Sequence, residues 1–277
     1  MAWTMGITQW CLPGNSAYTL RLAKQLGFDA VQLEFGSWAK GMALSHRRLC
    51  RLYVEESQEL GVRLLPLTVN ALCRYGVVNG LDTPDGRIAR DTISAALAAA
   101  ADMGLEGVTL PSFGAGEIRN DAHYAHTVEA LRFACGQAGS LLVYTENVLD
   151  APGMTRMFED CGSGQLRLLF DSQNYSVFGH DNAVDVLQTH WDKLGSHLHV
   201  KDGGDMGSMM LGTGSSPFRQ VMDVLRERDY AGTIVIENNY GGLPLCAQAA
   251  DCFELAELDA RTIRAAMANK RMKDVPR

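Results

Sequence analysis

Four side chains that can bind a metal ion follow successive apolar runs in the second half of the chain. The candidates are Glu146, Asp171, one histidine of the pair His197 and His199, and Glu237. Counted with His199, the intervals are 25, 28 and 38 residues, each about the length of one strand and one helix. If the strands are parallel neighbours, their carboxyl ends bring these side chains to one edge. A single carboxylate after a strand is a helix cap or turn residue as often as it is a ligand, but four such groups on successive strands favour a binding site.

Such a cluster offers three carboxylates and one imidazole to a cation. This donor set suits Mn²⁺, Mg²⁺ or Co²⁺, with Mn²⁺ expected first, and Zn²⁺ is also accepted by sites of this kind. With a divalent ion bound, the formal charge of the four side chains and the ion is −1. Such a site holds its ion and still leaves coordination positions for substrate oxygens. His197 and His199 share one face of their strand, since side chains repeat every second residue. Position alone leaves open which of them is the ligand.

The elements that must position these groups are eight β-rich apolar runs that alternate with segments of helical period. The runs cover residues 5–10, 30–35, 63–69, 107–111, 141–147, 166–171, 196–201 and 233–238. Helices before three of them are expected to stop at Gly27, Gly61 and Gly104, because glycine adopts the left-handed conformation that ends a helix. Eight such units predict an α/β fold, a (β/α)8 TIM barrel that forms a single domain over residues 1–277. A doubly wound open sheet is the alternative, but the CLPG segment after the first run is not its glycine-rich turn.

Composition narrows the class of protein. The 277 residues are 47% hydrophobic and 21% charged, and 25 Lys and Arg against 32 Asp and Glu give a formal charge of −7, which argues against a nucleic-acid partner. The seven cysteines are scattered without a C-x-x-C pair, so we expect neither a disulfide framework nor a zinc knuckle. The start of the chain lacks a basic segment followed by a long apolar run, and no stretch of about 18 apolar residues occurs. We therefore expect a cytoplasmic protein with no membrane partner.

Five motifs give the second half of the chain a family resemblance. They are TEN at 145–147, FDSQN at 170–174, HLHVKD at 197–202, LGTG at 211–214 and YAGTIVIEN at 230–238. Over residues 6–264 the chain resembles the sugar-phosphate isomerase/epimerase family of xylose isomerase-like TIM barrels. Within it, the resemblance is to the branch of L-ribulose-5-phosphate (L-xylulose-5-phosphate) 3-epimerase and D-tagatose or D-psicose 3-epimerase.

The resemblance implies a site and a substrate class. It assigns the metal to Glu146, Asp171, His199 and Glu237, and His199 is chosen because HVKD at 199–202 matches the H-x-K-D phrase of the family. It implies a sugar or sugar phosphate as the small-molecule partner, and a homo-oligomer.

The expected mechanism needs a base and a group that stabilises an enediolate. A divalent ion that binds the carbonyl and hydroxyl oxygens of a ketose would stabilise the enediolate. Glu146 and Glu237 are the expected catalytic pair, one removing the proton next to the carbonyl and the other returning it. Return to the opposite face is epimerisation, and return to the adjacent carbon is aldose–ketose isomerisation. The sequence leaves both open.

Further polar residues are expected to contact the substrate. The substrate-binding candidates are Glu34, Asn70, Asn174, His197 and Lys201. Ketohexose 3-epimerases usually carry a histidine at the position of Asn174, so this asparagine resembles the phosphopentulose branch instead. A phosphate would bind Lys201, Arg119 or the backbone amides of residues 211–216. Gly212 and Gly214 by themselves are more typical of a loop that turns than of a phosphate site.

Three other functions compete with this one. A lyase of the inosose-dehydratase kind uses the same metal and acid–base groups to expel water. A non-catalytic sugar-binding barrel is the second alternative, although such a protein has no reason to keep all four ligands. Endonuclease IV shares the barrel, but it needs a histidine where Asn174 stands and a D-x-H pair that residues 219–230 lack.

Overall fold

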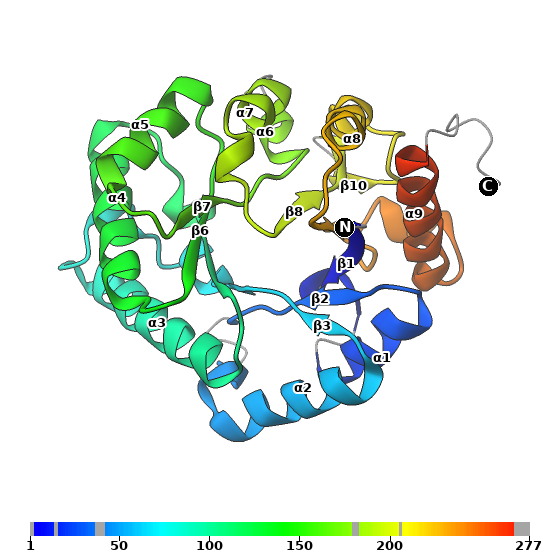
Figure 1. Ribbon diagram of the computed structural model, residues 1–277, viewed down its shortest axis with the longest axis horizontal. Helices are drawn as coiled ribbons and strands as arrows, with labels where there is room; N and C mark the ends of the chain where they lie inside the picture. The colour runs from blue at the N-terminus through cyan, green and yellow to red at the C-terminus, as the bar shows by residue number, and fades with distance from the viewer. Residues whose placement is uncertain (1–2, 14–15, 37–41, 179–182, 205–206, 269–277) are drawn as a thin grey trace. The chain divides into compact units, whose positions relative to one another are not determined.

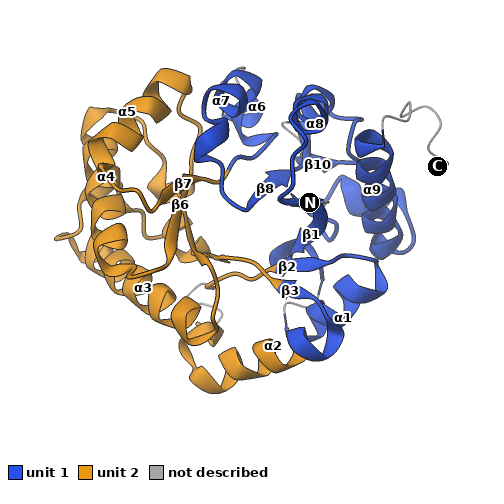
Figure 2. Cartoon of the chain, in the orientation of Figure 1, with its two compact units in different colours: residues 1–31, 57–63, 170–277 blue, residues 32–56, 64–169 orange. Residues whose placement is uncertain are grey.

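The computed structural model describes residues 3–13, 16–36, 42–178, 183–204 and 207–268 (Figure 1). The chain divides into two compact units, coloured separately in Figure 2. Unit 1 consists of Met1–Val31, Ser57–Arg63 and Phe170–Arg277, and unit 2 consists of Gln32–Glu56 and Leu64–Leu169.

Unit 1 contains a sheet in which the first strand of the chain lies beside the last. Strand β1 (Thr4–Thr8) pairs in parallel with β11 (Thr233–Ile236), which pairs in parallel with β8 (His197–Val200). β2 (Ala30–Gln32) and β3 (Arg63–Leu64), at the border with unit 2, complete the order β3-β2-β1-β11-β8. Every residue of β8 and β11 is buried, as expected for parallel strands that are covered on both faces.

Helices follow the strands of unit 1. They are α1 (Tyr18–Gln25), α6 (Asn174–Val177), α7 (Ala183–Thr189), α8 (Phe218–Glu227) and α9 (Cys252–Met267). Consecutive helices α7, α8 and α9 pack on one another (Figure 1). Between β8 and α8 the chain forms an antiparallel pair, β9 (Asp202–Gly204) and β10 (Gly207–Met209).

Unit 2 repeats the alternation of strand and helix. Its parallel sheet has the sequential order β4 (Leu67–Thr68), β5 (Gly107–Pro111), β6 (Leu142–Glu146) and β7 (Leu166–Leu168). Its helices are α3 (Pro84–Asp102), α4 (Asp121–Gln137) and α5 (Ala151–Cys161), packed in that order, and α2 (Arg47–Leu60) belongs to unit 2 as far as Glu56. The first turns of α3, α4 and α5 are capped by Thr83, Asn120 and Asp150, whose side-chain oxygens accept backbone N–H groups.

The expected elements are largely present. Each of the eight apolar runs contains a strand, and Gly27, Gly61 and Gly104 have φ angles of 81°, 62° and 66° where their helices stop. The run at 63–69 differs from expectation because it holds two short strands, β3 and β4, which pair in different sheets. The β9–β10 pair was not expected, since its six residues are too few for a period of two to stand out.

Candidate functional site

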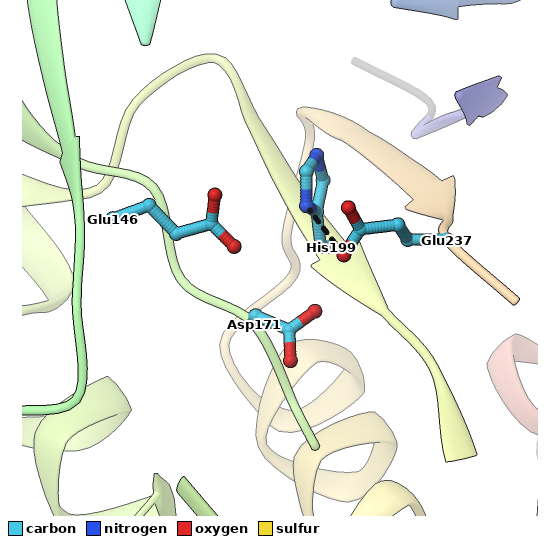
Figure 3. A group of neighbouring side chains, drawn as sticks. All are labelled: Glu146, Asp171, His199 and Glu237. Carbon is cyan, nitrogen blue, oxygen red and sulfur yellow. Dashed lines mark ion pairs between the residues drawn. The ribbon is translucent and has the colours of Figure 1, made fainter. Parts of the chain in front are cut away.

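Three of the predicted ligands lie together at the strand ends of unit 1. Asp171 forms a parallel bridge with His199 on β8. The backbone N–H of His199 donates to the carbonyl of Phe170 at 2.8 Å. Glu237 directly follows β11, and its N–H donates to the carbonyl of Val200 at 3.0 Å. This register brings one ligand atom from each of Asp171, His199 and Glu237 within 4.8 Å of the others (Figure 3).

Asp171 is held by one of its two oxygens. Its Oδ1 accepts the backbone N–H groups of Gln173 at 2.8 Å and Asn174 at 2.7 Å, at the start of α6. Its Oδ2 lies 3.6 Å from the Nζ atom of Lys201. The side chain is 1% exposed; the two amides hold one oxygen, and the other oxygen faces Lys201.

Glu237 is likewise anchored through one oxygen. Its Oε1 accepts the indole N–H of Trp10 at 3.1 Å, and its Oε2 lies 2.8 Å from Lys201 Nζ and 3.3 Å from His199 Nδ1. Burial raises the pKa of the Glu237 carboxyl, but the charges of Lys201 and His199 and hydrogen bonds with both outweigh burial and lower the pKa overall. These contacts therefore favour the ionised form of Glu237.

The donor chemistry of these three residues fits a divalent ion. Two carboxylate oxygens and one imidazole nitrogen converge. Each carboxylate also accepts a hydrogen bond from a donor outside the cluster, and in metal sites such hydrogen bonds orient the ligands. A positively charged ammonium, that of Lys201, already lies against both carboxylates. The position therefore accepts a cation.

The predicted site residues of unit 2 also lie at strand ends. Glu146 is the last residue of β6, is buried, and accepts the N–H of Ser112 with its carbonyl at 2.8 Å; Figure 3 draws it with the three residues of unit 1. Glu34 bridges to Thr68 at the end of β4, and Asn70 Nδ2 donates to Glu34 Oε2 at 3.2 Å. The structure thus brings Glu34 and Asn70 together.

The remaining predicted contacts lie in unit 1. Lys201 follows β8 and Asn174 begins α6, and both line a cavity. His197 is the first residue of β8, is fully buried, and is not among the residues that line this cavity. Burial lowers the pKa of the His197 imidazole well below its ordinary value, and the charges of His199 and Arg63 lower it further, so this ring is neutral.

The cavity beside the cluster has a volume of about 430 Å³ and belongs entirely to unit 1. Its lining combines aromatic, amide, hydroxyl and charged groups, so it offers both apolar surface and hydrogen-bonding groups to a small molecule. The lining residues are Trp10, Cys11, Gln173, Asn174, Val177, Phe178, Lys201, Gly204, Gly207, Ser208, Glu237 and Asn239. Sequence reasoning missed Gln173, Phe178, Ser208 and Asn239 as candidates; the place of Gln173 and Asn239 just after strands was the available signal.

The structure shows which group the backbone amides of residues 211–216 bind. The backbone N–H groups of Gly212, Gly214 and Ser216 donate to the carboxylate of Asp202 at 2.8, 3.0 and 3.1 Å. A carboxylate of the chain itself therefore occupies these amides, which agrees with a glycine loop that turns and not with the phosphate site that was the alternative. Arg119, another candidate, donates to Glu117 Oε2 at 2.7 Å.

A second buried carboxylate, Asp259 on α9, supports the same region. It accepts the N–H of Leu211 at 2.8 Å, the Nδ2 of Asn238 at 2.7 Å and the hydroxyl of Tyr240 at 2.8 Å. Asn238 in turn accepts the N–H of Asp202 at 3.1 Å. Burial raises the pKa of Asp259 to about 7, although the three hydrogen bonds act to lower it.

Two whole-chain features bear on the predicted class of protein. The seven cysteines all lie in the described part of the chain, and none of them forms a disulfide. Within the described part of the chain, no helix combines the length and the apolar character that crossing a membrane requires.

Comparisons with known proteins identify the fold. A family model described as "Xylose isomerase-like TIM barrel" matches residues 20–264. A curated relative from Actinoplanes sp. (strain ATCC 31044 / CBS 674.73 / SE50/110), 2-epi-5-epi-valiolone 7-phosphate 2-epimerase, is 29% identical over 247 residues, which cover 87% of this chain and 88% of the relative.

Solved structures agree on the architecture. An L-ribulose 3-epimerase superposes with a TM-score of 0.75 at 20% identity, over 99% of this chain and 97% of its own. The 3-keto-D-glucoside 4-epimerase from E. coli has a TM-score of 0.72 at 18% identity, over 95% of this chain and 99% of its own. At such identities the likeness concerns the fold, and together with the matching model it confirms the predicted TIM barrel.

Proposed function

Because this chain belongs to the xylose isomerase-like TIM barrel family, we propose that it is a sugar epimerase or isomerase that depends on a divalent metal ion. The family resemblance of the sequence motifs is thereby confirmed. The observation that carries the proposal is the convergence of Asp171, His199 and Glu237 beside a cavity lined by polar groups. The relative that acts as a 2-epimerase on a phosphorylated compound supports the reaction class.

The proposed metal ligands are Glu146, Asp171, His199 and Glu237, with Mn²⁺ as the proposed ion. This set includes Glu146 of unit 2, and the proposal therefore treats residues 1–277 as one barrel domain. When bound, the ion would polarise the carbonyl of a ketose and stabilise negative charge on its enediolate. Asp171 and His199 would hold the ion without moving protons, because the braced Oδ1 of Asp171 and the buried ring of His199 have little freedom.

Glu237 and Glu146 are the proposed proton-transfer pair. Without the metal ion, Lys201 and His199 lower the pKa of the Glu237 carboxyl, and its ionised carboxylate can accept a proton from the carbon next to the carbonyl. The Trp10 N–H holds its Oε1 and so limits rotation of the carboxylate. Glu146 would return a proton on the other side, which gives epimerisation, and return to the neighbouring carbon would give isomerisation.

The proposed substrate is a ketose or ketose phosphate. Asn174 and Lys201 would contact it from the cavity wall, and Glu34 and Asn70 would bind hydroxyl groups as a hydrogen-bonded pair. His197, buried behind His199 with the ring centroids 6.2 Å apart, would act on the substrate only through that neighbour. We further propose a homo-oligomer in the cytoplasm, a compartment compatible with seven cysteines that form no disulfide.

The test is exchange of substrate hydrogen with solvent deuterium in the presence of Mn²⁺, across pentuloses, hexuloses and their phosphates. Glu146→Gln and Glu237→Gln should each slow exchange by about two to four powers of ten, because each removes a general acid–base group. Glu129→Gln, at an exposed position on α4, is the matched control and should exchange normally. Near-normal exchange in either site variant would remove the acid–base assignment, and loss of water from the substrate would favour the lyase alternative.

A further inference from the structure

Lys201 is held by its backbone so that its side chain faces the carboxylates of unit 1. Its N–H donates to Ser172 Oγ at 3.0 Å, and its carbonyl accepts the hydroxyls of Ser172 at 2.8 Å and Ser216 at 3.2 Å. Three hydrogen bonds at one residue directly after β8 leave the side chain as the part that can move. That side chain is 18% exposed.

The Lys201 ammonium contacts one oxygen of each carboxylate, while the other oxygen of each accepts a hydrogen bond from elsewhere in the chain. Asp171 Oδ1 is used by backbone amides and Glu237 Oε1 by the indole of Trp10. Lys201 Nζ lies 3.6 Å from Asp171 Oδ2 and 2.8 Å from Glu237 Oε2. These inward-facing oxygens are also the ones a metal ion would need.

Charge explains why an ammonium lies there. Asp171 and Glu237 bring two negative charges into a largely buried position, and buried charges are costly unless they are paired. Lys201 supplies one positive charge to this pair. A divalent ion at the same oxygens would supply two, and at a few ångströms it would repel the ammonium strongly.

We propose that Lys201 is an internal cation that competes with the metal ion for Asp171 and Glu237. In the metal-free protein the ammonium pairs with both carboxylates. When a divalent ion binds, the ammonium loses these contacts and turns into the cavity that Lys201 also lines, where it can donate to an oxygen of the sugar. Metal binding would then precede sugar binding. This inference rests on the metal site of the proposed function.

The first experiment measures Mn²⁺ affinity by isothermal titration calorimetry, with circular dichroism to verify folding. Lys201→Met removes the charge and keeps a side chain of similar length, so we expect Mn²⁺ to bind at least tenfold more tightly than to the wild type. Lys201→Arg keeps the charge and is the matched control; its affinity should be no tighter than that of the wild type. Equal or weaker affinity in Lys201→Met overturns the competition. If none of the three proteins binds Mn²⁺, the proposed function fails with it.

The second experiment needs no variant. Reductive methylation of the wild type with formaldehyde and a borane reductant, followed by peptide mass spectrometry, reports the accessibility of each lysine amine. Mn²⁺ should raise the labelling rate of Lys201 severalfold, while the exposed Lys24 on α1 should be unaffected. An unchanged or lower rate at Lys201, in protein shown by calorimetry to bind Mn²⁺, overturns the release of the ammonium and leaves the metal site standing.

Discussion

Replacing Asp202 by asparagine should weaken the fold around residues 202–216. The Asp202 carboxylate is buried and accepts four backbone N–H groups, two on each oxygen. Oδ1 accepts from Gly203 at 2.9 Å and Ser216 at 3.1 Å, and Oδ2 accepts from Gly212 at 2.8 Å and Gly214 at 3.0 Å. Asparagine keeps one acceptor oxygen and turns an NH₂ group toward the other two amides.

The magnitude follows from the number of bonds lost. Two hydrogen bonds to a charged acceptor disappear, and each contributes about 1.5–3 kcal/mol, so the free energy of unfolding should fall by about 3–6 kcal/mol. The hairpin β9–β10 lies within this segment, and Gly204, Gly207 and Ser208 line the cavity. Sugar binding should therefore weaken together with stability.

Urea unfolding followed by far-UV circular dichroism measures the loss, provided the m-value is unchanged. Asp150→Asn is the matched control: Asp150 is exposed, accepts one N–H, from Gly153 at 2.9 Å, and caps α5. Asparagine caps a helix about as well as aspartate, so this change should cost less than about 0.5 kcal/mol. A loss below about 1 kcal/mol in Asp202→Asn would refute the reasoning.

The remaining predictions concern buried positions. The pKa of Asp259 is about 7 in the fold against an ordinary 3.8. Its favourable contribution to the free energy of unfolding is therefore fully present below about pH 4 and is lost as the pH rises through about 7. Urea titrations from pH 4 to 7 should show the wild type losing up to about 4 kcal/mol relative to Asp259→Asn, and parallel profiles would contradict this. Gly107→Ala places a Cβ 2.1 Å from the Leu142 carbonyl oxygen and should destabilise by about 1–3 kcal/mol or more. Gly136→Ala, exposed on α4 with open space around it, should stabilise by up to about 1 kcal/mol; similar melting shifts for both glycine variants would count against the steric account.

Residues that act through local rules were predictable. The helix ends at Gly27, Gly61 and Gly104 require a positive φ. Glycine adopts this conformation readily, so its position in the sequence predicts where such a helix stops. Asp171 and Glu237 were placed at strand ends because a parallel sheet aligns its carboxyl ends, whatever fills the space between. Their role as metal ligands stays a prediction, as do those of Glu146 and His199.

Residues that act through side-chain partners far along the chain were not predictable. Trp10 donates to Glu237 across 227 residues, and Lys201 pairs with the same carboxylate across 36. The sequence left open whether the 211–216 loop is a simple turn or binds a phosphate, and in the structure Asp202 occupies the amides of 212, 214 and 216. Backbone N–H groups donate to a carboxylate as readily as to a phosphate, so the spacing of the residues alone does not show which anion they bind.

The sequence by itself determined the alternation of strand and helix, the family, and the positions along the chain where polar groups end each strand. It did so because periodicity and glycine conformation act over a few residues. Tertiary structure alone decided which oxygen of each carboxylate is anchored and which one faces Lys201. That choice depends on rotamers and distances between segments that only packing brings together.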